Sequence, residues 1–454
     1  MRTTPIGLAI LALAASLACA GAASAQNFEL RNGAVVSAGD PVDIAISGLP
    51  PGSEVEVRAQ RALKNHYLPG APTRRHTSTA RFLADENGRI DLASTPSIGG
   101  SYQGVDANGL FWSMQPANDE PVPADDEVEL QAFIAGKRVA SVSFELQTQP
   151  PGFRVRAAPS LPGSYFAEHP GAGKRPVIIV VSGADNLAVS RESLMPQFFA
   201  KGYSVFHFAT YEIIFGPSEP TVKGLPTRYV DISIDKLQTA YDWLAKQPSV
   251  DDDRIGLYGH SRNGAYVLLA ATRFPWVKAV AAIAPSDVVW EGWGDGIRLG
   301  TTSSYSWNGK SLPYVPYSDN WFRETSKLGR GQPARLRTPM DEGRWANPDR
   351  VAAARIPVED YAGSLLVAGG EQDNLWSAGH MVQNIAESRA AGGLETTLLV
   401  FPDAGHNLTG DGQNPVVLLF EDEADRAVLA RAQARTWRTT LKFFDQALEP
   451  GEVK

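Results

Sequence analysis

The sequence predicts an α/β protein of two domains, an antiparallel β-sandwich followed by a larger domain whose mostly parallel sheet is covered by helices. Three observations predict this. The chain has 454 residues, which is more than one hydrophobic core usually supports. Short runs of alternating apolar and polar residues fill residues 27–149, whereas strand-like and helix-like segments alternate after Arg175. The two patterns meet at Pro150–Pro151–Gly152, so we expect domains over residues 26–150 and 151–454.

The composition and motifs of the chain argue against nucleic acids, metals and cofactors as partners. The chain is 43% hydrophobic and 20% charged, as globular proteins are, and its formal net charge is −8. This balance lacks the basic excess that phosphate backbones require, so we expect no nucleic-acid partner. The sequence contains no H-E-x-x-H pattern and no glycine-rich phosphate loop, and we expect neither a metal nor a cofactor. Nothing in the sequence predicts an oligomeric state.

The first 25 residues resemble a bacterial secretory signal peptide. Met1–Arg2 gives a positive start, an apolar stretch follows, and Ala23–Ser24–Ala25 is a typical small-residue cleavage site. We therefore expect a secreted or periplasmic protein without a membrane span after cleavage, with an uncleaved anchor helix as the alternative. The one cysteine, Cys19, lies within this segment, so the mature chain would hold no disulfide.

The predicted sandwich is built from short strands. Alternation or turn residues mark strands at residues 41–49, 53–60, 78–85, 109–116 and 137–147, which together favour an immunoglobulin-like arrangement. No cluster of catalytic residue types occurs there. We interpret this domain as a structural or substrate-shaping module, with independent ligand binding as the alternative.

The second domain alternates strands with helices. Strands are expected at residues 176–183, 204–210, 254–259, 277–285 and 363–370, with helices between them. Within residues 230–247, helical spacing gives one apolar face made of Ile232, Leu237, Ala240, Tyr241 and Leu244. Alternation of this kind places chemistry at the carboxyl ends of the strands.

The segment "RIGLYGHSRNGAY", residues 254–266, carries the first candidate for catalysis. A strand ending in Gly259, then Ser261, then a helix is the strand–turn–helix of the nucleophile elbow in the α/β-hydrolase fold. The usual pattern is G-x-S-x-G, but Asn263 stands in place of the second glycine and Gly264 follows one residue later. We expect Asn263 to be tolerated, because asparagine adopts unusual backbone angles more readily than most residues. An ordinary turn serine is the alternative.

A serine nucleophile needs a base and an acid that orients the base, and in this fold they follow in the order Ser, Asp or Glu, His. Asp373 follows the strand at 363–370, and His406 follows the last strand, so both belong at the same edge of the sheet as Ser261. Glu371 is a rival acid, and Asp373 can alternatively cap a helix that begins near Trp376. The other histidines lie beside the serine, within a helix or before the elbow: His260, His380, His66, His76, His169 and His207.

An oxyanion hole would complete this site. One donor is expected to be the backbone N–H of Arg262, directly after the candidate nucleophile, and the other the N–H of Ala184 or a neighbour after the strand at 176–183. The Arg262 side chain either adds positive charge to the site or is a solvated arginine in the first turn of a helix.

A long insertion, residues 291–360, follows the strand at 277–285, where lids over active sites are often found. Its aromatic residues can line an acyl pocket: Trp293, Tyr305, Trp307, Tyr314, Tyr317, Trp321, Phe322 and Trp345. Its basic residues can hold an anionic headgroup: Arg298, Lys310, Arg323, Lys327, Arg330, Arg335, Arg337 and Arg344. The alternative is a surface excursion with a small core of its own.

Several of these segments resemble one family across nearly all of the mature chain. "SGLPPGSEVEVRA", "GGSYQGVDANGLFWSMQP", "LYGHSRNGAYVLLAATRF" and "FPDAGHNL" are similar to acyl-CoA thioesterases and bile acid-CoA:amino acid N-acyltransferases. The resemblance implies an acyl-enzyme mechanism with Ser261 as nucleophile, His406 as base and then acid, and Asp373 as its orienting partner. Family members that transfer acyl groups to amino acids tend to carry cysteine at the nucleophile, so serine here favours water as the acceptor.

The sequence thus predicts a serine hydrolase of acyl-CoA-type thioesters, whose partner is a small-molecule acyl thioester or ester. Two alternatives stay open. Export would take the enzyme away from coenzyme A and favour a carboxylesterase acting on a lipid or carbohydrate ester. A catalytically silent binding protein would result if Asn263 broke the geometry of the triad.

Overall fold

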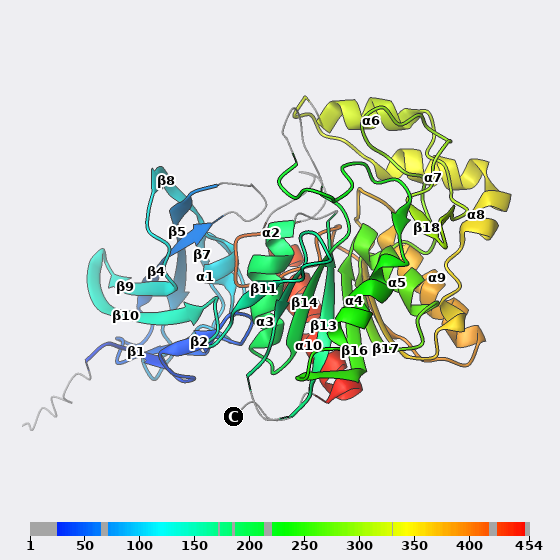
Figure 1. The fold of residues 1–454 in the computed structure, drawn as a ribbon. Helices are drawn as coiled ribbons and strands as arrows, with labels where there is room; N and C mark the ends of the chain where they lie inside the picture. Colours follow the sequence, from blue (N-terminus) through cyan, green and yellow to red (C-terminus); the bar gives the residue numbers. More distant parts are fainter. Residues whose placement is uncertain are drawn as a thin grey trace, which may run out of the picture.

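The structure of the chain is a computed structural model. This structure describes residues 25–64, 71–170, 173–183, 187–212, 220–328, 330–416 and 425–449. The expected signal peptide, apart from Ala25, lies outside the described residues. Figure 1 shows a β-rich part in blue and cyan beside a larger part in which helices cover a central sheet. The chain has the α/β-hydrolase fold preceded by a β-sandwich, as the sequence predicted.

The sandwich consists of two sheets. The first has the order β1–β3–β6, and the second the order β2–β10–β9–β4–β5–β7, with β8 also pairing with β5. Their bounds are β1 Asn27–Leu30, β2 Val35–Ser37, β3 Ile44–Ser47, β4 Glu54–Lys64, β5 Thr73–Leu83, β6 Ile90–Asp91, β7 Gly99–Gly100, β8 Gln115–Pro121, β9 Glu127–Ile134 and β10 Lys137–Gln147. Most neighbouring strands are antiparallel, although β2 lies parallel to β10.

Side chains of β4 alternate between the two faces of the sheet. Val55, Val57 and Ala59 are buried, whereas Glu54 and Arg58 are exposed. Such alternation is typical of a sheet with one solvated face.

The expected strand at residues 109–116 was wrong over its first half. Residues Gly109–Trp112 form a single helical turn, α1, and β8 begins only at Gln115. All four residues of α1 are buried. A strand cannot bury four consecutive side chains on one face, so the helical turn allows the apolar run "GLFW" to pack as a unit.

The second domain contains a sheet of order β11–β12–β14–β13–β16–β17–β20–β21. The strands are β11 Val155–Ala157, β12 Tyr165–Ala167, β13 Arg175–Ser182, β14 Ser204–Ala209, β16 Val250–His260, β17 Val277–Ile283, β20 Ser364–Gly370 and β21 Thr397–Phe401. From β14 to β21 every pairing is parallel. The carboxyl ends of these strands therefore share one edge of the sheet.

Helices cover both faces of this sheet, as the strand–helix alternation predicted (Figure 1). They are α2 Leu187–Val189, the π-helix η1 Ser190–Leu194, α3 Met195–Phe199, α4 Lys236–Leu244, α5 Arg262–Ala271, α9 Ala378–Ala391 and α10 Arg426–Leu448. Buried residues of α3 and α10 pack into the same hydrophobic cluster as the sandwich interior, whereas α4, α5 and α9 contribute to a second cluster. One continuous core thus joins the sandwich to one face of the hydrolase sheet.

One local expectation in this domain was wrong. Ile232 lies in a short strand, β15 Ile232–Ser233, rather than on the apolar face of α4, which begins at Lys236. β15 pairs with β18 Tyr305–Trp307, which pairs with β19 Lys310–Ser311. Pairing with a distant strand thus overrides the local pattern.

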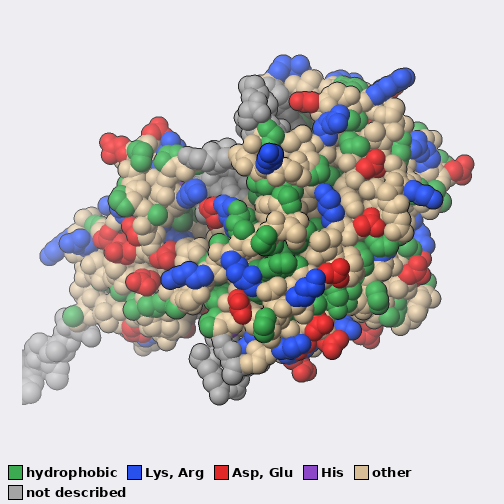
Figure 2. Space-filling model, viewed as in Figure 1, with side chains coloured by type: hydrophobic (Ala, Val, Ile, Leu, Met, Phe, Trp, Pro, Cys, Tyr) green, Lys and Arg blue, Asp and Glu red, His purple; other side chains and the backbone are tan. Residues whose placement is uncertain are grey.

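The insertion at residues 291–360 contains β18 and β19 and further helices. These are α6 Asn320–Leu328, α7 Arg337–Ala346, α8 Pro348–Ala354 and the 3-10 helix η2 Val358–Asp360; Figure 1 draws α6, α7 and α8 in yellow-green to yellow. Within the described ranges, no helix is both long and apolar enough to cross a membrane. On the face shown in Figure 2, basic and acidic side chains are interspersed.

Candidate active site

Ser261 stands at a sharp turn between β16 and α5. Its backbone angles are φ +60° and ψ −125°, a conformation that L-residues rarely adopt and that costs about 1–3 kcal/mol. The Ser261 N–H donates to the carbonyl oxygen of Ile283 on β17 at 2.8 Å, which helps to hold the turn. The sequence therefore builds an elbow of the type predicted, with its strain at the serine itself.

Position 259, two residues before Ser261, requires glycine because the backbone of Asn263 lies close to it. A Cβ on Gly259 would overlap the carbonyl oxygen of Asn263. Asn263, by contrast, lies within α5, is fully buried and does not have a positive φ. Asn263 is tolerated as expected, but not because of unusual backbone angles, since the positive φ of the elbow falls on Ser261. Asparagine in place of glycine is thus compatible with the turn.

Three predicted residues meet beside this elbow. His406 Nε2 lies 2.9 Å from Ser261 Oγ, and His406 Nδ1 lies 2.6 Å from Asp373 Oδ2. Asp373 follows β20 and His406 follows β21, so both come from the same sheet edge as Ser261. All three are buried, with Ser261 the most accessible at 7%. The arrangement can pass a proton from a serine hydroxyl to an imidazole that a carboxylate orients.

Asp373 faces the imidazole and does not cap a helix near Trp376, because the next helix, α9, begins only at Ala378. Its Oδ2 faces His406, while its Oδ1 accepts from the backbone N–H groups of Leu375 at 2.7 Å and Trp376 at 3.1 Å. These bonds fix the carboxylate relative to the loop after β20. Glu371, the rival acid, has an exposed side chain. The structure therefore brings Asp373, and not Glu371, to the imidazole.

His260 lies behind the same imidazole, a neighbour that the sequence analysis set aside. Its Nε2 lies 3.3 Å from the carbonyl oxygen of His406, to which it can donate, and the two rings are 5.1 Å apart. Burial, together with the neighbouring His406, lowers the pKa of His260 to about 3. His260 is therefore neutral across the physiological range and supports the loop of His406 without adding a charge.

The Arg262 side chain is buried, so the interpretation of a solvated arginine was wrong. Its Nη1 donates to Ser304 Oγ at 2.8 Å and its Nη2 donates to the hydroxyl of Tyr317. The guanidinium also lies 5.5–5.9 Å from the ring centres of Tyr229, Trp376 and Tyr317. Cation–π contacts of this kind stabilise a desolvated positive charge. The elbow helix is thereby anchored to the insertion.

Glu291 binds Tyr317, one of the residues that surround the Arg262 guanidinium. Its carboxylate Oε2 accepts from the N–H groups of Tyr317 at 3.0 Å and Gly300 at 3.1 Å. Burial raises the pKa of Glu291 to about 7. At neutral pH the carboxyl group is thus divided between its protonated and ionised forms.

The expected oxyanion hole is only partly within the described residues. Arg262 is the first residue of α5, and the first N–H groups of a helix have no partner within it. Its amide is therefore available where a negative charge beside Ser261 would develop. Ala184 lies outside the described residues.

The insertion does not form a separate small core. Its buried aromatic residues, including Tyr305, Tyr317 and Trp321, belong to the same cluster as the hydrolase sheet and α5. Several of its basic residues are engaged within the fold: Arg344 binds Asp287 at 2.6 Å, Lys327 binds Glu324 at 2.7 Å and Arg337 binds Asp341 at 3.1 Å. These three cations are neutralised by carboxylates, which leaves them poorly suited to hold an anionic headgroup.

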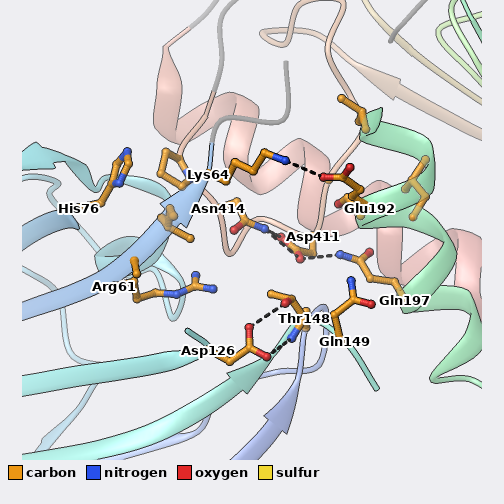
Figure 3. Close-up of a pocket in the computed structure, with 18 of the residues that line it drawn as sticks. Arg61, Lys64, His76, Asp126, Thr148, Gln149, Glu192, Gln197, Asp411 and Asn414 are labelled. Atoms are coloured by element: carbon orange, nitrogen blue, oxygen red, sulfur yellow. Dashed lines mark hydrogen bonds and ion pairs between the residues drawn. The ribbon is translucent and has the colours of Figure 1, made fainter. Parts of the chain in front are cut away.

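A cavity of about 600 Å³ lies where the sandwich meets the second domain (Figure 3). Its walls include Arg61 and Lys64 from β4, Glu192 from η1, and the segment from Asn407 to Pro415 that follows His406. Figure 3 shows the Arg61 side chain pointing from β4 toward this segment. Among the residues that the structure describes, no group of three or more His, Cys, Asp or Glu side chains is arranged to hold a metal ion.

Comparison with known families gives matches in both domains. The N-terminal region described as "Acyl-CoA thioester hydrolase/BAAT N-terminal region" matches residues 39–152. The region described as "BAAT / Acyl-CoA thioester hydrolase C terminal" matches residues 232–300 and 312–411. The second match includes the segments of Ser261, Asp373 and His406.

Curated relatives match over most of the chain. Acyl-coenzyme A thioesterase 1 of Mus musculus is 28% identical over 385 residues, 81% of this chain and 82% of that protein. Acyl-coenzyme A thioesterase 6 of Mus musculus is 26% identical and covers 90% of this chain and 94% of its own length. The acylaminoacyl peptidase of Pyrococcus horikoshii, a solved structure, covers 94% of this chain and 64% of its own at 12% identity, with a TM-score of 0.40.

Proposed function

The chain belongs to the family of acyl-CoA thioester hydrolases and bile acid-CoA:amino acid N-acyltransferases, and from this premise we propose that it is a serine hydrolase of acyl-CoA-type thioesters. Thioesterase relatives at 26–28% identity support the coarser assignment, hydrolysis of a thioester or ester. The observation that carries the finer proposal is the continuous hydrogen-bonded path from Ser261 Oγ through His406 to Asp373 at the strained elbow.

In the proposed mechanism Ser261 Oγ adds to the carbonyl carbon of the acyl group while its proton passes to His406 Nε2. Asp373 holds the imidazole in the required tautomer and stabilises the imidazolium. The oxyanion accepts a hydrogen bond from the Arg262 N–H, and the first N–H groups of α5 add a positive potential. The C–S bond then breaks, and the leaving thiolate takes the proton from His406.

The second half of the cycle releases the acyl group. Water gives a proton to His406 Nε2 and adds to the acyl-serine carbonyl carbon, and the ester C–O bond breaks. The proton returns to Ser261 Oγ, and a carboxylic acid leaves. Serine suits this step because its oxygen ester reacts with water once a base activates that water.

The test is hydrolysis of palmitoyl-CoA beside a series of p-nitrophenyl esters, with Ser261→Ala as the paired variant. We expect CoA-thioester turnover that falls at least about 10⁴-fold in Ser261→Ala. Labelling by a fluorophosphonate, which phosphonylates an activated serine and releases fluoride, is expected in the parent protein only. Turnover that persists in Ser261→Ala would refute the role of the serine.

A carboxylesterase is a second candidate, favoured by the apolar segment and the Ala23–Ser24–Ala25 site at the N-terminus. We propose that the chain is exported and that residues 1–25 are removed. Cell fractionation and N-terminal sequencing of the mature protein test this. Turnover of p-nitrophenyl esters without turnover of palmitoyl-CoA would move the assignment from thioesters to esters.

A further inference from the structure

We propose that Arg61 of the sandwich is a positioning residue for His406, because it holds, from the other domain, the loop on which the imidazole is carried. This inference rests on the proposed function. It assigns a part in the reaction to the sandwich, for which the sequence predicted a structural or substrate-shaping role.

The loop in question, residues 404–416, runs from β21 into the boundary between the domains. Near its start it is fixed by the hydrolase domain: His260 Nε2 reaches the His406 carbonyl oxygen at 3.3 Å, and Gln433 of α10 donates to the Asn407 carbonyl oxygen at 2.9 Å. Further along, Asp411 Oδ2 accepts from Gln197 of α3 at 2.9 Å. Up to this residue, the contacts named here come from the domain that carries the loop.

At Gln413 the support comes from the sandwich instead. The Gly39 N–H donates to Gln413 Oε1 at 2.9 Å, and Gln413 Nε2 donates to the carbonyl oxygen of Asp40. Arg61 Nη1 donates to the Gln413 carbonyl oxygen at 2.9 Å. Both the side chain and the main chain of one loop residue are therefore bound by the other domain.

Arg61 occupies an unusual place in β4. It continues the inward-facing series Val55, Val57 and Ala59, yet it is a cation and is only 3% exposed. At this position the side chain reaches the loop of His406, through the bond to the Gln413 carbonyl oxygen. Figure 3 shows the guanidinium near Asp126 and directed toward Asp411 and Asn414. An arginine at an apolar position of a strand is expensive to bury unless its charge and donors are used.

The electrostatic surroundings keep this arginine charged. Burial lowers the pKa of Arg61 to about 10, and Asp411, Asp126 and Asp125 oppose that shift. Asp411 is itself buried, and burial raises the pKa of its carboxyl group. At neutral pH Arg61 therefore carries a positive charge between the loop and the sandwich, and its removal would leave the acidic side chains without this cation.

The geometry of proton transfer explains why this support matters for the reaction. The imidazole must keep two short contacts at once, 2.9 Å to Ser261 Oγ and 2.6 Å to Asp373 Oδ2. Displacement of a catalytic group by about 1 Å, even when caused by a distant residue, can reduce the rate roughly 100-fold. Gln413 is seven positions from His406 on the same loop, so its anchoring to the sandwich restrains the segment that carries the imidazole.

The test compares Arg61→Met, Arg61→Lys and a matched control, Lys64→Met, in the full chain. Lys64 lies three residues further along β4 and binds Glu192 of the second domain at 3.1 Å, but this bond does not involve the loop of His406. The readouts are kcat and KM with the substrate found active, and the rate constant for fluorophosphonate labelling of Ser261, all measured well below the melting temperature.

We expect Arg61→Met to lower kcat and the labelling rate constant by roughly 10- to 100-fold with KM changed less than about twofold. Arg61→Lys should recover part of this loss because an ammonium group can still donate to the Gln413 carbonyl, and Lys64→Met should match the parent. If Arg61→Met does not fold, Gln413→Leu removes the bonds to Gly39 and Asp40 and is expected to act in the same direction.

Two results would overturn the inference. One is a folded Arg61→Met protein that is labelled at the parental rate. The other is an equal loss in Arg61→Met and Lys64→Met, which would mean that general weakening of the domain contact is responsible. A parent protein that is never labelled would instead count against the proposed function, so the two failures are distinguishable.

Discussion

Strand β4 of the sandwich and strand β13 of the hydrolase sheet bury their side chains in different ways. Along β4, buried Val55 and Val57 alternate with exposed or half-buried neighbours until Arg61. Along β13, every residue from Pro176 to Ser182 is buried. One sheet has a solvated face, whereas the other lies between two layers of helices.

This difference determines in which domain functional residues can be predicted from the sequence. A strand buried on both faces holds few polar side chains along its length, so the polar groups of the candidate site gather where strands of the hydrolase sheet end. Ser261 follows β16 directly, and Asp373 and His406 lie in the loops after β20 and β21. In β4 of the sandwich, polar residues occur at about every second position, and only a polar residue on the apolar face, such as Arg61, gives a local sign that it meets the other domain.

The largest effect is expected at the acid of the hydrolase domain. Asp373→Asn should lower kcat by about 10⁴-fold, because an amide cannot stabilise the imidazolium or hold the same tautomer. Its Oδ1 can still accept from Leu375 and Trp376, so the loop should stay folded. Steady-state kinetics with circular dichroism check this. Glu371→Gln, at the exposed rival acid, is the matched control and should retain activity within about twofold; a loss there would exchange the two roles.

Two glycine substitutions, one in each domain, distinguish the cost of steric overlap from the cost of a left-handed backbone conformation. Gly259→Ala should destabilise the protein by about 3 kcal/mol or more and abolish activity, because the new methyl group overlaps the Asn263 carbonyl oxygen at the elbow. Gly52 of the sandwich has φ +71° and open space around it, so Gly52→Ala should cost only about 1–2 kcal/mol. Urea denaturation measures both. Similar losses would show that the elbow can relax.

Acid should weaken the hydrolase domain through its buried histidines. Burial lowers the pKa of His207 on β14 to about 4, so this residue stays neutral in the folded state while the unfolded chain binds a proton below about pH 6.5. Stability should therefore be complete above pH 6.5 and fall as pH approaches 4, by about 2–3 kcal/mol for this group. His207→Gln should flatten the fall in urea-unfolding free energy between pH 6.5 and 4.5. An unchanged slope would contradict a neutral buried imidazole.

The smallest changes in stability are expected for single substitutions in β4 and β13, which test the burial pattern of each strand. Val57→Ala should cost about 2 kcal/mol, whereas Arg58→Ala, one residue later on the outer face, should change stability by no more than about 0.5–1 kcal/mol. On β13, Ile178→Val and Ile179→Val should each cost about 1 kcal/mol, because both faces are buried. Thermal unfolding of the four variants checks this. A marked difference between the two isoleucine sites would break the comparison.

Most of the hydrolase site was predictable because its signals are local. A strand, a glycine and a serine within a few residues define the elbow, and chain order supplies the acid and the base. The position of His260 behind His406 was not predictable, because it depends on how the loop after β21 packs against the end of β16. The burial of Arg262 depends on Tyr317, which lies 55 residues away in the sequence.

The errors in the fold have a similar origin. The run "GLFW" in α1 is as apolar as a strand, and only its complete burial explains the helical turn. Ile232 joins a strand because its partner Tyr305 comes from the insertion. Arg61 and Gln413 are 352 positions apart, so their contact is set by docking of the domains. An arginine on the apolar face of β4 was the one local sign of it.

The bond from the Gly39 N–H to the Gln413 side chain makes amide hydrogen exchange at Gly39 a measure of how often the domain boundary opens. An amide bonded across a domain boundary exchanges its hydrogen with water when that bond opens, and a local opening of the boundary at Gln413 suffices for this. Exchange at Gly39 would therefore report openings of this boundary, whereas exchange in the centre of β4 would report unfolding of the sandwich. Each opening also releases the hold of the sandwich on the loop of His406. Under the Arg61 proposal, the fraction of molecules ready to react follows how often this boundary opens, and mild denaturant should lower it as exchange at Gly39 rises.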